Sequence, residues 1–296
     1  MTRKAAEFGI NRNTATTAVR RGVFFAANNA LMDVPIGTRF SIADLTYTVS
    51  QRISAGTYRL TCESTGTIGN EQFGALLPID YVANLVRAEL TEVLVPGEDE
   101  ETDEALRQRF LETVNEPAFG GNVEDYKNKI NDIPGVGATK IYPAWSGGGT
   151  VKCTIIAADL GVPSTTLIND VQEYMDPLTF TGQGLGQAPI GHKVTIVGVT
   201  STTINISTKL TLATDVTLEQ VQQDIEDVIN AYLLELRKDW ADQMQIVVRI
   251  AQVDAKILSV LGVEDVADTT INTSATNLTL GSDQIPVFGA VFISEV

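Results

Sequence analysis

The sequence has few of the residues from which catalytic and metal-binding sites are usually built. It contains one histidine, His192, and two cysteines, Cys62 and Cys153, in 296 residues. The cysteines stand apart, without a CxxC pair or a neighbouring histidine, so the sequence predicts neither a disulfide framework nor a zinc site. A catalytic triad would have to use His192, which is better explained as a residue at the start of a strand. We therefore expect no catalytic residue, no cofactor and no metal.

Long apolar runs and positive charge are also scarce. No apolar stretch approaches the ~20 residues that a membrane-spanning helix needs, and the N-terminus lacks the apolar core of a signal peptide. Lys and Arg number 21 against 37 Asp and Glu, so the formal net charge is −16. Such a chain repels nucleic acid, and we expect no nucleic-acid partner and no membrane span.

The basic residues cluster at the N-terminus, in Arg3, Lys4, Arg12, Arg20 and Arg21. This cluster is typical of a solvated helix face or of a surface that contacts a partner. A short helix is predicted over residues 4–21, followed by β-branched and aromatic runs over residues 22–75 that indicate a small β-rich domain. The first predicted domain therefore covers residues 1–77.

The most unusual stretch is "VLVPGEDEETDEALRQRFLETV", residues 93–114, which has six carboxylates between Glu98 and Glu104. Leu106, Phe110 and Val114 recur at a spacing of four, which predicts a helix that begins near Thr102 or Asp103. Carboxylates at a helix start accept hydrogen bonds from free N–H groups and interact favourably with the helix dipole.

Two ion pairs within this helix are also predicted, Asp103 with Arg107 and Glu104 with Arg107. A calcium loop needs acids at alternating positions around a glycine, whereas this run is contiguous. Helix capping is therefore favoured over a metal site. With a second helix over Val123, Tyr126 and Ile130, the segment 78–134 is predicted to be a strand followed by a helical hairpin.

Residues 135–265 are predicted to form an α+β domain of two strand-strand-helix units. The first unit contains a hairpin at "SGGG", residues 146–149, and a short helix that ends at Pro177. The second contains a long helix, for which Thr217 and Gln220 form a capping box and the apolar residues recur on one face. A last helix is expected around residues 245–261, and residues 266–296 are expected to form a terminal β region. The fold class is therefore α+β and multidomain.

Two further features have competing interpretations. "GQGLGQ", residues 182–187, follows a helix and precedes a strand, which is the reverse of the order in a phosphate-binding loop, so we expect a mobile loop. Trp145 and Trp240 are candidate interface anchors, although packing in a core or at its rim explains each equally well.

Several segments together resemble the baseplate J-like family, whose members are baseplate wedge proteins of contractile-tailed phages and related tail-like particles. They are "GTIGN" at 66–70, "VLVPGEDEETDEALRQRF" at 93–110, "GGNVEDYKNKINDIPGVGATKIYP" at 120–143 and "GGGTVKCTII" at 147–156. The resemblance extends from about residue 5 to about residue 265. Family members usually carry a further helical segment before the counterpart of residues 4–10, so we expect this chain to be a truncated form.

The resemblance implies a structural, non-enzymatic wedge subunit that forms a ring around the tail hub. Its implied partners are other copies of itself, neighbouring wedge proteins, and sheath-initiating and hub components, in a six-fold assembly. The implied location is the baseplate of a virion or tail-like particle that is assembled in the host bacterial cytoplasm. Two alternatives stay open: a receptor- or cell-wall-binding tail module, which would suit the Thr-rich β segments, and a peptidoglycan hydrolase that uses a carboxylate between Glu98 and Glu104.

Overall fold

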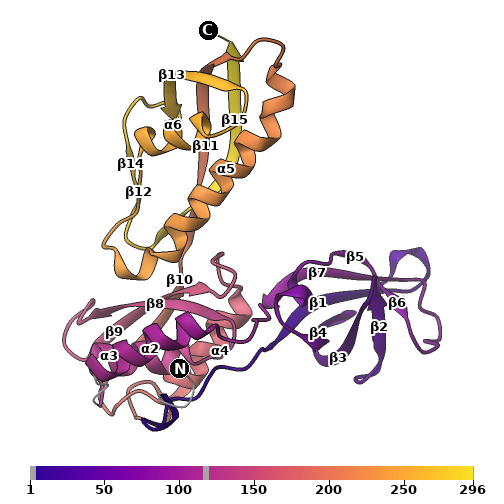
Figure 1. Ribbon diagram of the computed structural model, residues 1–296. Helices are drawn as coiled ribbons and strands as arrows, with labels where there is room; N and C mark the ends of the chain where they lie inside the picture. The colour runs from indigo at the N-terminus through magenta and orange to yellow at the C-terminus, as the bar shows by residue number, and fades with distance from the viewer. Residues whose placement is uncertain (1–4, 116–119, 296) are drawn as a thin grey trace. The chain divides into compact units, whose positions relative to one another are not determined.

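The computed structural model describes residues 5–115 and 120–295, and the chain divides into two compact units (Figure 1). The first unit is Met1–Gly198 and the second is Val199–Val296. Each unit contains both sheets and helices, which confirms the predicted α+β class. None of the described helices is both long and apolar enough to cross a membrane.

The first part of unit 1 is a β-sheet that closes on itself. Its strands are β1 (Thr17–Phe25), β2 (Arg39–Ile42), β3 (Leu45–Ser54), β4 (Thr57–Thr65), β5 (Gly74–Ala75), β6 (Leu77–Pro78) and β7 (Arg87–Val95). The strand order is β5-β7-β1-β4-β3-β2-β6. Because β5 and β6 belong to one continuous segment, residues 74–78 pair with β7 at one end and with β2 at the other. The sheet is therefore a small barrel without a long free edge, and we call it the barrel.

The barrel corrects the prediction of a helix over residues 4–21. Residues 17–25 instead form β1, in which exposed and buried residues alternate and which pairs with both β4 and β7. The helical pattern was wrong because long-range pairing overrides weak local propensity. Two short 3₁₀ turns, η1 (Ala27–Asn29) and η2 (Thr67–Asn70), connect the strands.

Arg20 of β1 is completely buried, so it is not part of a solvated basic surface. Its guanidinium donates hydrogen bonds to the carbonyls of Gly69 (2.9 Å), Gln72 (2.7 Å) and Thr91 (2.8 Å). The ring of Phe73 lies 4.3 Å from the guanidinium carbon. Burial lowers the Arg20 pKa, and these carbonyl contacts offset the cost of placing the charge inside the barrel. Arg3 and Lys4 lie outside the described residues.

We expect Arg20→Met to lower the free energy of unfolding of the barrel by at least about 3 kcal/mol, because it leaves several buried carbonyls without a donor. Arg52→Met is the matched control, since Arg52 lies on the same barrel but forms an exposed pair with Asp33. Urea denaturation followed by circular dichroism measures both variants. Equal stability of the two variants would contradict the structural role of Arg20.

The remainder of unit 1 is a three-stranded sheet with helices on one face. Its elements are α2 (Asp103–Asn115), α3 (Val123–Asn131), β8 (Val136–Pro143), β9 (Thr150–Ala157), α4 (Thr165–Met175), the 3₁₀ turn η3 (Leu178–Phe180) and β10 (Lys193–Gly198). The strand order is β10-β9-β8, with an antiparallel β8–β9 hairpin and a parallel β9–β10 pair that α4 connects. Side chains of α3 and α4 form one core with β9 and β10. We call this sheet with its helices the central layer, and Figure 1 labels its helices and strands.

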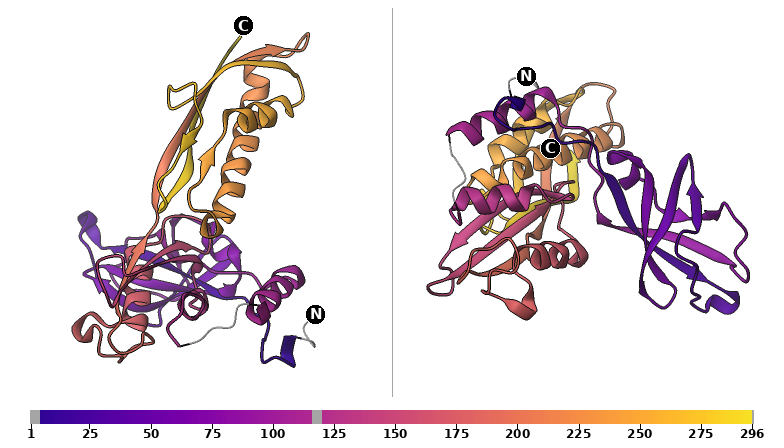
Figure 2. Two further views of the ribbon diagram at one scale, coloured as in Figure 1. Left: turned by 90° about the vertical axis from the view of Figure 1, so that its left-hand side faces the viewer. Right: turned by 90° about the horizontal axis from the view of Figure 1, so that it is seen from below.

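Unit 2 has a three-stranded sheet of order β13-β11-β15, whose core is formed with α5 and α6. Figure 2 shows α5 lying along these strands. The elements are β11 (Thr200–Leu212), α5 (Leu218–Lys238), the 3₁₀ turn η4 (Trp240–Asp242), β12 (Val247–Val248), α6 (Ile250–Leu258), β13 (Val263–Ile271), β14 (Leu278–Thr279) and β15 (Gln284–Glu295). The predicted capping box of Thr217 and Gln220 is present at the start of α5.

The sequence-based division at residues 77, 134 and 265 is different from the observed one. Residues 87–95, which were assigned to the helical unit, pair with β1 in the barrel. Strands β10 and β11 follow each other in the chain but belong to different sheets, so the predicted 135–265 domain is split at residue 198. The terminal β region is not separate, because β13 and β15 both pair with β11. Strand partners are set by long-range packing, which local patterns do not encode.

Candidate functional site

The side chains that could bind a metal or act in catalysis lie in different parts of the chain. Among residues 5–115 and 120–295, no group of three His, Cys, Asp or Glu side chains is placed to hold a metal ion. Cys62 is buried in the barrel core and Cys153 in the central layer, where burial raises the pKa of the Cys153 thiol to about 12. His192 Nδ1 lies 2.8 Å from the hydroxyl of Tyr126, and the two rings stack. Burial raises the pKa of that hydroxyl, so Tyr126 is not a ready nucleophile.

The acidic run precedes α2 as predicted, but the cap hydrogen bond shown at the start of α2 comes from Thr102, and most of the carboxylates have other partners. The hydroxyl of Thr102 accepts a hydrogen bond from the Ala105 N–H (3.2 Å) at the start of α2. Only Asp103 and Glu104 lie in the first turn. Glu104 is 3.8 Å from Arg107, whereas the predicted Asp103 to Arg107 pair is replaced by contact of Asp103 with Arg12. The side chain of Val114 lies outside the described part of the chain.

Glu101 joins the N-terminal segment to α2. Arg109 donates two hydrogen bonds of 2.8 Å to the Glu101 carboxylate, and the Asn13 N–H donates a third of 3.1 Å. Arg109 also donates to the Asn11 carbonyl at 2.6 Å. These contacts hold the pKa of Glu101 below its usual value, with the Arg109 hydrogen bonds as the main cause. A small core lies beside them, formed by Ala5, Ile10, Leu106 and Phe110.

We expect hydrogen-exchange protection of residues 5–14 to fall in acid. A carboxylate whose pKa is lowered by folding stabilises the fold above its unfolded pKa of about 4.3, and this contribution is lost as the pH falls through the lower folded value. Mass spectrometry, corrected for the intrinsic exchange rate at each pH, should show less protection at pH 3 than at pH 7. Glu101→Gln should reduce the difference, and the pair of Asp103 with Arg12 accounts for the remainder, whereas Glu104→Gln, at an exposed position, should retain it in full. Protection independent of pH in the wild type would contradict this role of Glu101.

The two motifs "GTIGN" and "PGEDE" are in direct contact. The Asn70 amide donates to the Gly97 carbonyl (2.9 Å) and accepts from the Gly97 N–H (2.8 Å). The Asp99 carboxylate accepts from the N–H (2.9 Å) and the hydroxyl (3.0 Å) of Thr67. We call residues 66–70 together with 96–99 the Gly97 junction. It fixes the point at which the chain leaves the barrel.

Glu98 extends this junction to the central layer. Its carboxylate accepts a hydrogen bond from the Gly135 N–H (2.7 Å), and its own N–H donates to the Thr16 hydroxyl (3.0 Å). Burial raises the pKa of Glu98 and outweighs the opposing effect of the Gly135 N–H. Among the described residues, this partly buried carboxylate accepts its hydrogen bond from Gly135, which suits a contact that fixes position.

A glycine is required at position 97 by close packing of the backbone. A Cβ atom there would lie 2.6 Å from the Gly66 carbonyl oxygen and 2.7 Å from the Ala18 nitrogen. Backbone atoms cannot rotate away as a side chain can, so any larger residue must separate the two motifs.

Gly97→Ala should therefore destabilise the chain by about 1–3 kcal/mol through overpacking. Gly148→Ala is the control, because a Cβ at position 148 meets nothing within 4 Å. Thermal unfolding followed by circular dichroism compares the two. If both alanine variants melted at the wild-type temperature, the close approach at Gly97 would not be a constraint.

The glycine-rich segment between α4 and β10 is held at its base. Asp176, which is buried, accepts hydrogen bonds from the Thr181 hydroxyl (2.5 Å), the Gly182 N–H (3.0 Å) and the Val194 N–H (2.9 Å). We call residues 177–193 the glycine loop. Its tip exposes apolar side chains, and Leu185 and Ile190 are 65% and 83% exposed. The predicted mobility of this loop stays a prediction.

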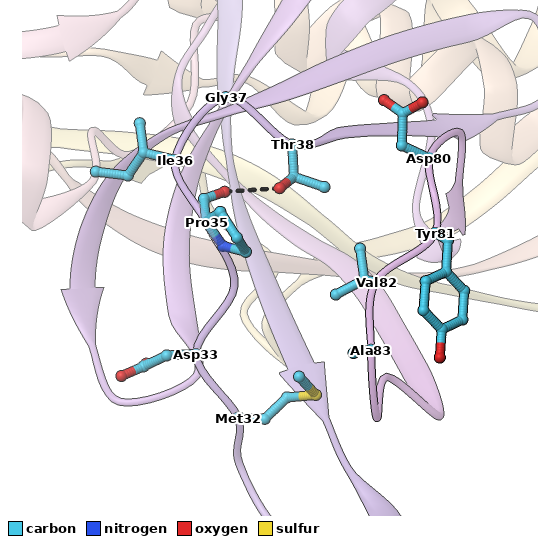
Figure 3. A pocket seen from close by; sticks show the side chains of 10 residues that line it. All are labelled: Met32, Asp33, Pro35, Ile36, Gly37, Thr38, Asp80, Tyr81, Val82 and Ala83. Atoms are coloured by element: carbon cyan, nitrogen blue, oxygen red, sulfur yellow. Dashed lines mark hydrogen bonds between the residues drawn. The ribbon is translucent and has the colours of Figure 1, made fainter.

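A groove of about 510 Å³ lies at one end of the barrel, between residues 32–38 and 80–83 (Figure 3). Pro35, Ile36, Tyr81 and Val82 contribute apolar surface, and Tyr81 is 91% exposed. Asp33 at the groove is compensated, because the Gly56 N–H and Arg52 hold its pKa at about 2. Sequence patterns missed this groove, since its two segments are far apart in the chain and neither has a regular period.

The two tryptophans have different environments. Trp240 is completely buried and its indole N–H donates to the Ser282 carbonyl at 3.0 Å, so it is a core residue. Trp145, in the turn between β8 and β9, is half exposed and stays a candidate contact residue.

Comparison with known proteins gives consistent results over the whole chain. The model of the baseplate J-like central domain matches residues 118–198, and that of the baseplate J-like protein C-terminal domain matches residues 204–294. The chain is 37% identical over 295 residues to the protein YqbT of Bacillus subtilis (strain 168), covering 99% of this chain and 80% of that protein. It is 36% identical over 296 residues to the phage-like element PBSX protein XkdT of the same organism, with the same coverage.

More distant relatives are also found. Baseplate protein gp47 of Escherichia phage Mu is 31% identical over 212 residues, which is 67% of this chain and 58% of that protein. A chain of the anti-feeding prophage (AFP) baseplate aligns with 97% of this chain and 80% of its own length, at 9% identity and a TM-score of 0.48. That score is too low to establish a common fold by itself.

The matched domains and relatives define the class: the chain is a structural protein of phage and prophage tails. Within this class, the chain belongs to the baseplate J-like family, and the resemblance seen in the sequence is confirmed. The boundary between the two family models also coincides with the division between the two units of the structure.

Proposed function

We propose that the chain is a wedge subunit of the baseplate that helps to close a ring around the central hub through protein contacts. The observation that carries this proposal is that exposed apolar side chains occur on several separate parts of the chain. The barrel presents Tyr81, the glycine loop presents Ile190, and unit 2 presents Leu261. Tyr81 is accompanied by exposed Ile36 and Ile190 by exposed Leu185, and neighbouring exposed apolar side chains of this kind suit a subunit that contacts several partners.

The expected partners are other copies of the chain, neighbouring wedge proteins, and sheath-initiating and hub components. We expect six-fold symmetry and a location in the baseplate of a virion or tail-like particle that is assembled in the bacterial cytoplasm. The carboxylates from Glu98 to Glu104 do not support a hydrolase, because Glu98, Asp99, Glu101 and Asp103 make the structural contacts described above. A non-enzymatic role is therefore part of the proposal.

A cell-wall-binding tail module is the second candidate, and one feature favours it. A groove of about 350 Å³ in unit 2 combines Asn205, Ser207 and Asn272 with the exposed ring of Phe292. Amide and hydroxyl groups beside an aromatic face can bind a sugar through hydrogen bonds and stacking. Specific retention of the purified protein on a peptidoglycan column would favour this candidate.

Co-expression with the adjacent tail genes tests the wedge proposal. We expect the chain to co-purify in a discrete complex with other tail proteins, because its exposed apolar surfaces need partners to cover them. Light scattering should give the mass of the complex, and electron microscopy should show wedges or six-fold rings. A stable monomer that binds none of the co-expressed proteins, and that is absent from purified tail particles, would contradict the proposal.

A further inference from the structure

We propose that the glycine loop of one copy inserts into the barrel groove of the next copy, so that identical chains are joined head to tail. This inference rests on the proposed wedge function and adds to it the surfaces that meet. Both surfaces belong to unit 1, and each is a protruding or hollow feature that exposes apolar side chains.

The groove exposes polar and apolar surface to a similar extent, and one of its carboxylates has no close partner. Its segments, residues 31–38 and 76–86, contain Asp33 and Asp80 and no Lys or Arg. Asp33 is paired with Arg52, and Arg39, which feels the charge of Asp80, is engaged with Glu63 at 2.7 Å. Within the described residues, no hydrogen bond or ion pair of the Asp80 carboxylate is present. The exposed apolar side chains of Ile36 and Tyr81 and the charge of Asp80 therefore favour an insert that carries both apolar side chains and a positive charge.

The glycine loop has these properties. Residues 177–193 contain no Asp or Glu, although the whole chain has 37 in 296 residues, and they contain Lys193 and His192. With His neutral, the formal charge of the loop is +1, whereas the groove retains the negative charge of Asp80 after Asp33 has paired with Arg52. Lys193 is exposed and forms no ion pair within the described part of the chain. In a chain of net charge −16, acidic surface repels another copy, whereas this loop does not.

Hydrogen bonds within the chain also hold the glycine loop in a defined conformation before any contact. The hydrogen bonds to Asp176 fix its base, and the Gly191 N–H donates to the Gly182 carbonyl at 2.9 Å, which closes the segment that carries Leu185 and Ile190. A loop that is ordered before contact pays less conformational entropy on binding. Opposite surfaces that meet head to tail generate a ring when the rotation closes, whereas a contact between identical patches gives only a dimer.

Disulfide trapping tests the contact directly. Two differently tagged copies, one with Tyr81→Cys and one with Leu185→Cys, are co-expressed with the adjacent tail genes, and the purified complex is oxidised with copper phenanthroline. We expect a covalent dimer that carries both tags on a non-reducing gel. The wild type is a control because Cys62 and Cys153 are buried. Met244→Cys, at a 90% exposed position in unit 2, replaces Tyr81→Cys in the matched control and should give no mixed dimer.

Each outcome is decisive. A complex that assembles without a mixed dimer, that contains one copy of the chain, or that gives Tyr81→Cys dimers alone overturns the head-to-tail contact and leaves the wedge function intact. Another tail protein crosslinked to Tyr81→Cys assigns the groove to that partner and overturns the proposal. A chain that enters no tail complex overturns both the wedge function and the contact.

Charge reversal gives an independent measurement. Asp80→Lys or Lys193→Glu alone should lower the yield of the mixed dimer roughly fivefold, the effect of an ion pair worth about 1 kcal/mol. The double variant should recover most of the wild-type yield, because the pair is restored with opposite sign. Additive losses in the double variant would show that the two residues do not meet.

Discussion

The close approach of three backbone segments at Gly97 is the constraint on which the architecture of unit 1 depends. Residues 66–70, residues 96–99 and the start of β1 meet there with no room for a side chain. Asn70 closes the approach with two hydrogen bonds to the Gly97 backbone, and Glu98 continues it to Gly135. The exit from the barrel is thereby tied both to the barrel wall and to the central layer.

The position of Gly97 explains why the carboxylates of the acidic run contact different parts of the chain. Adjacent carboxylates at Glu98, Asp99 and Glu101 serve three different neighbours: the turn at Gly135, the turn at Thr67 and the pair of Arg109 with Asn13. Burial makes the ionised form of Glu98 less favourable and raises its pKa. Arg109 has the opposite effect on Glu101 and lowers its pKa. One short segment therefore positions several parts of the chain, which suits a subunit whose function depends on where its surfaces are presented.

The distribution of charge and of exposed apolar side chains limits where two copies of the chain can make contact. A net charge of −16 keeps identical chains apart wherever acidic surface faces acidic surface. Contact is then favoured where the charge is locally absent or reversed, as in the glycine loop, and where apolar side chains are exposed, as around Tyr81. Baseplate assembly requires this kind of selectivity, because wrong contacts between abundant copies must be weaker than the correct ones.

Short-range features of this protein were determined by the sequence itself. The capping box at Thr217 and the hairpin at residues 146–149 were readable because caps and turns depend on residues a few positions apart. The family motifs were readable for the same reason. Only the tertiary structure decided that residues 17–25 are a strand, that Arg20 is buried among carbonyls 49 to 72 residues away, and that Asp80 stands beside a groove. Those outcomes depend on which distant segments pack together, and the free energy of that packing is not encoded in any local period.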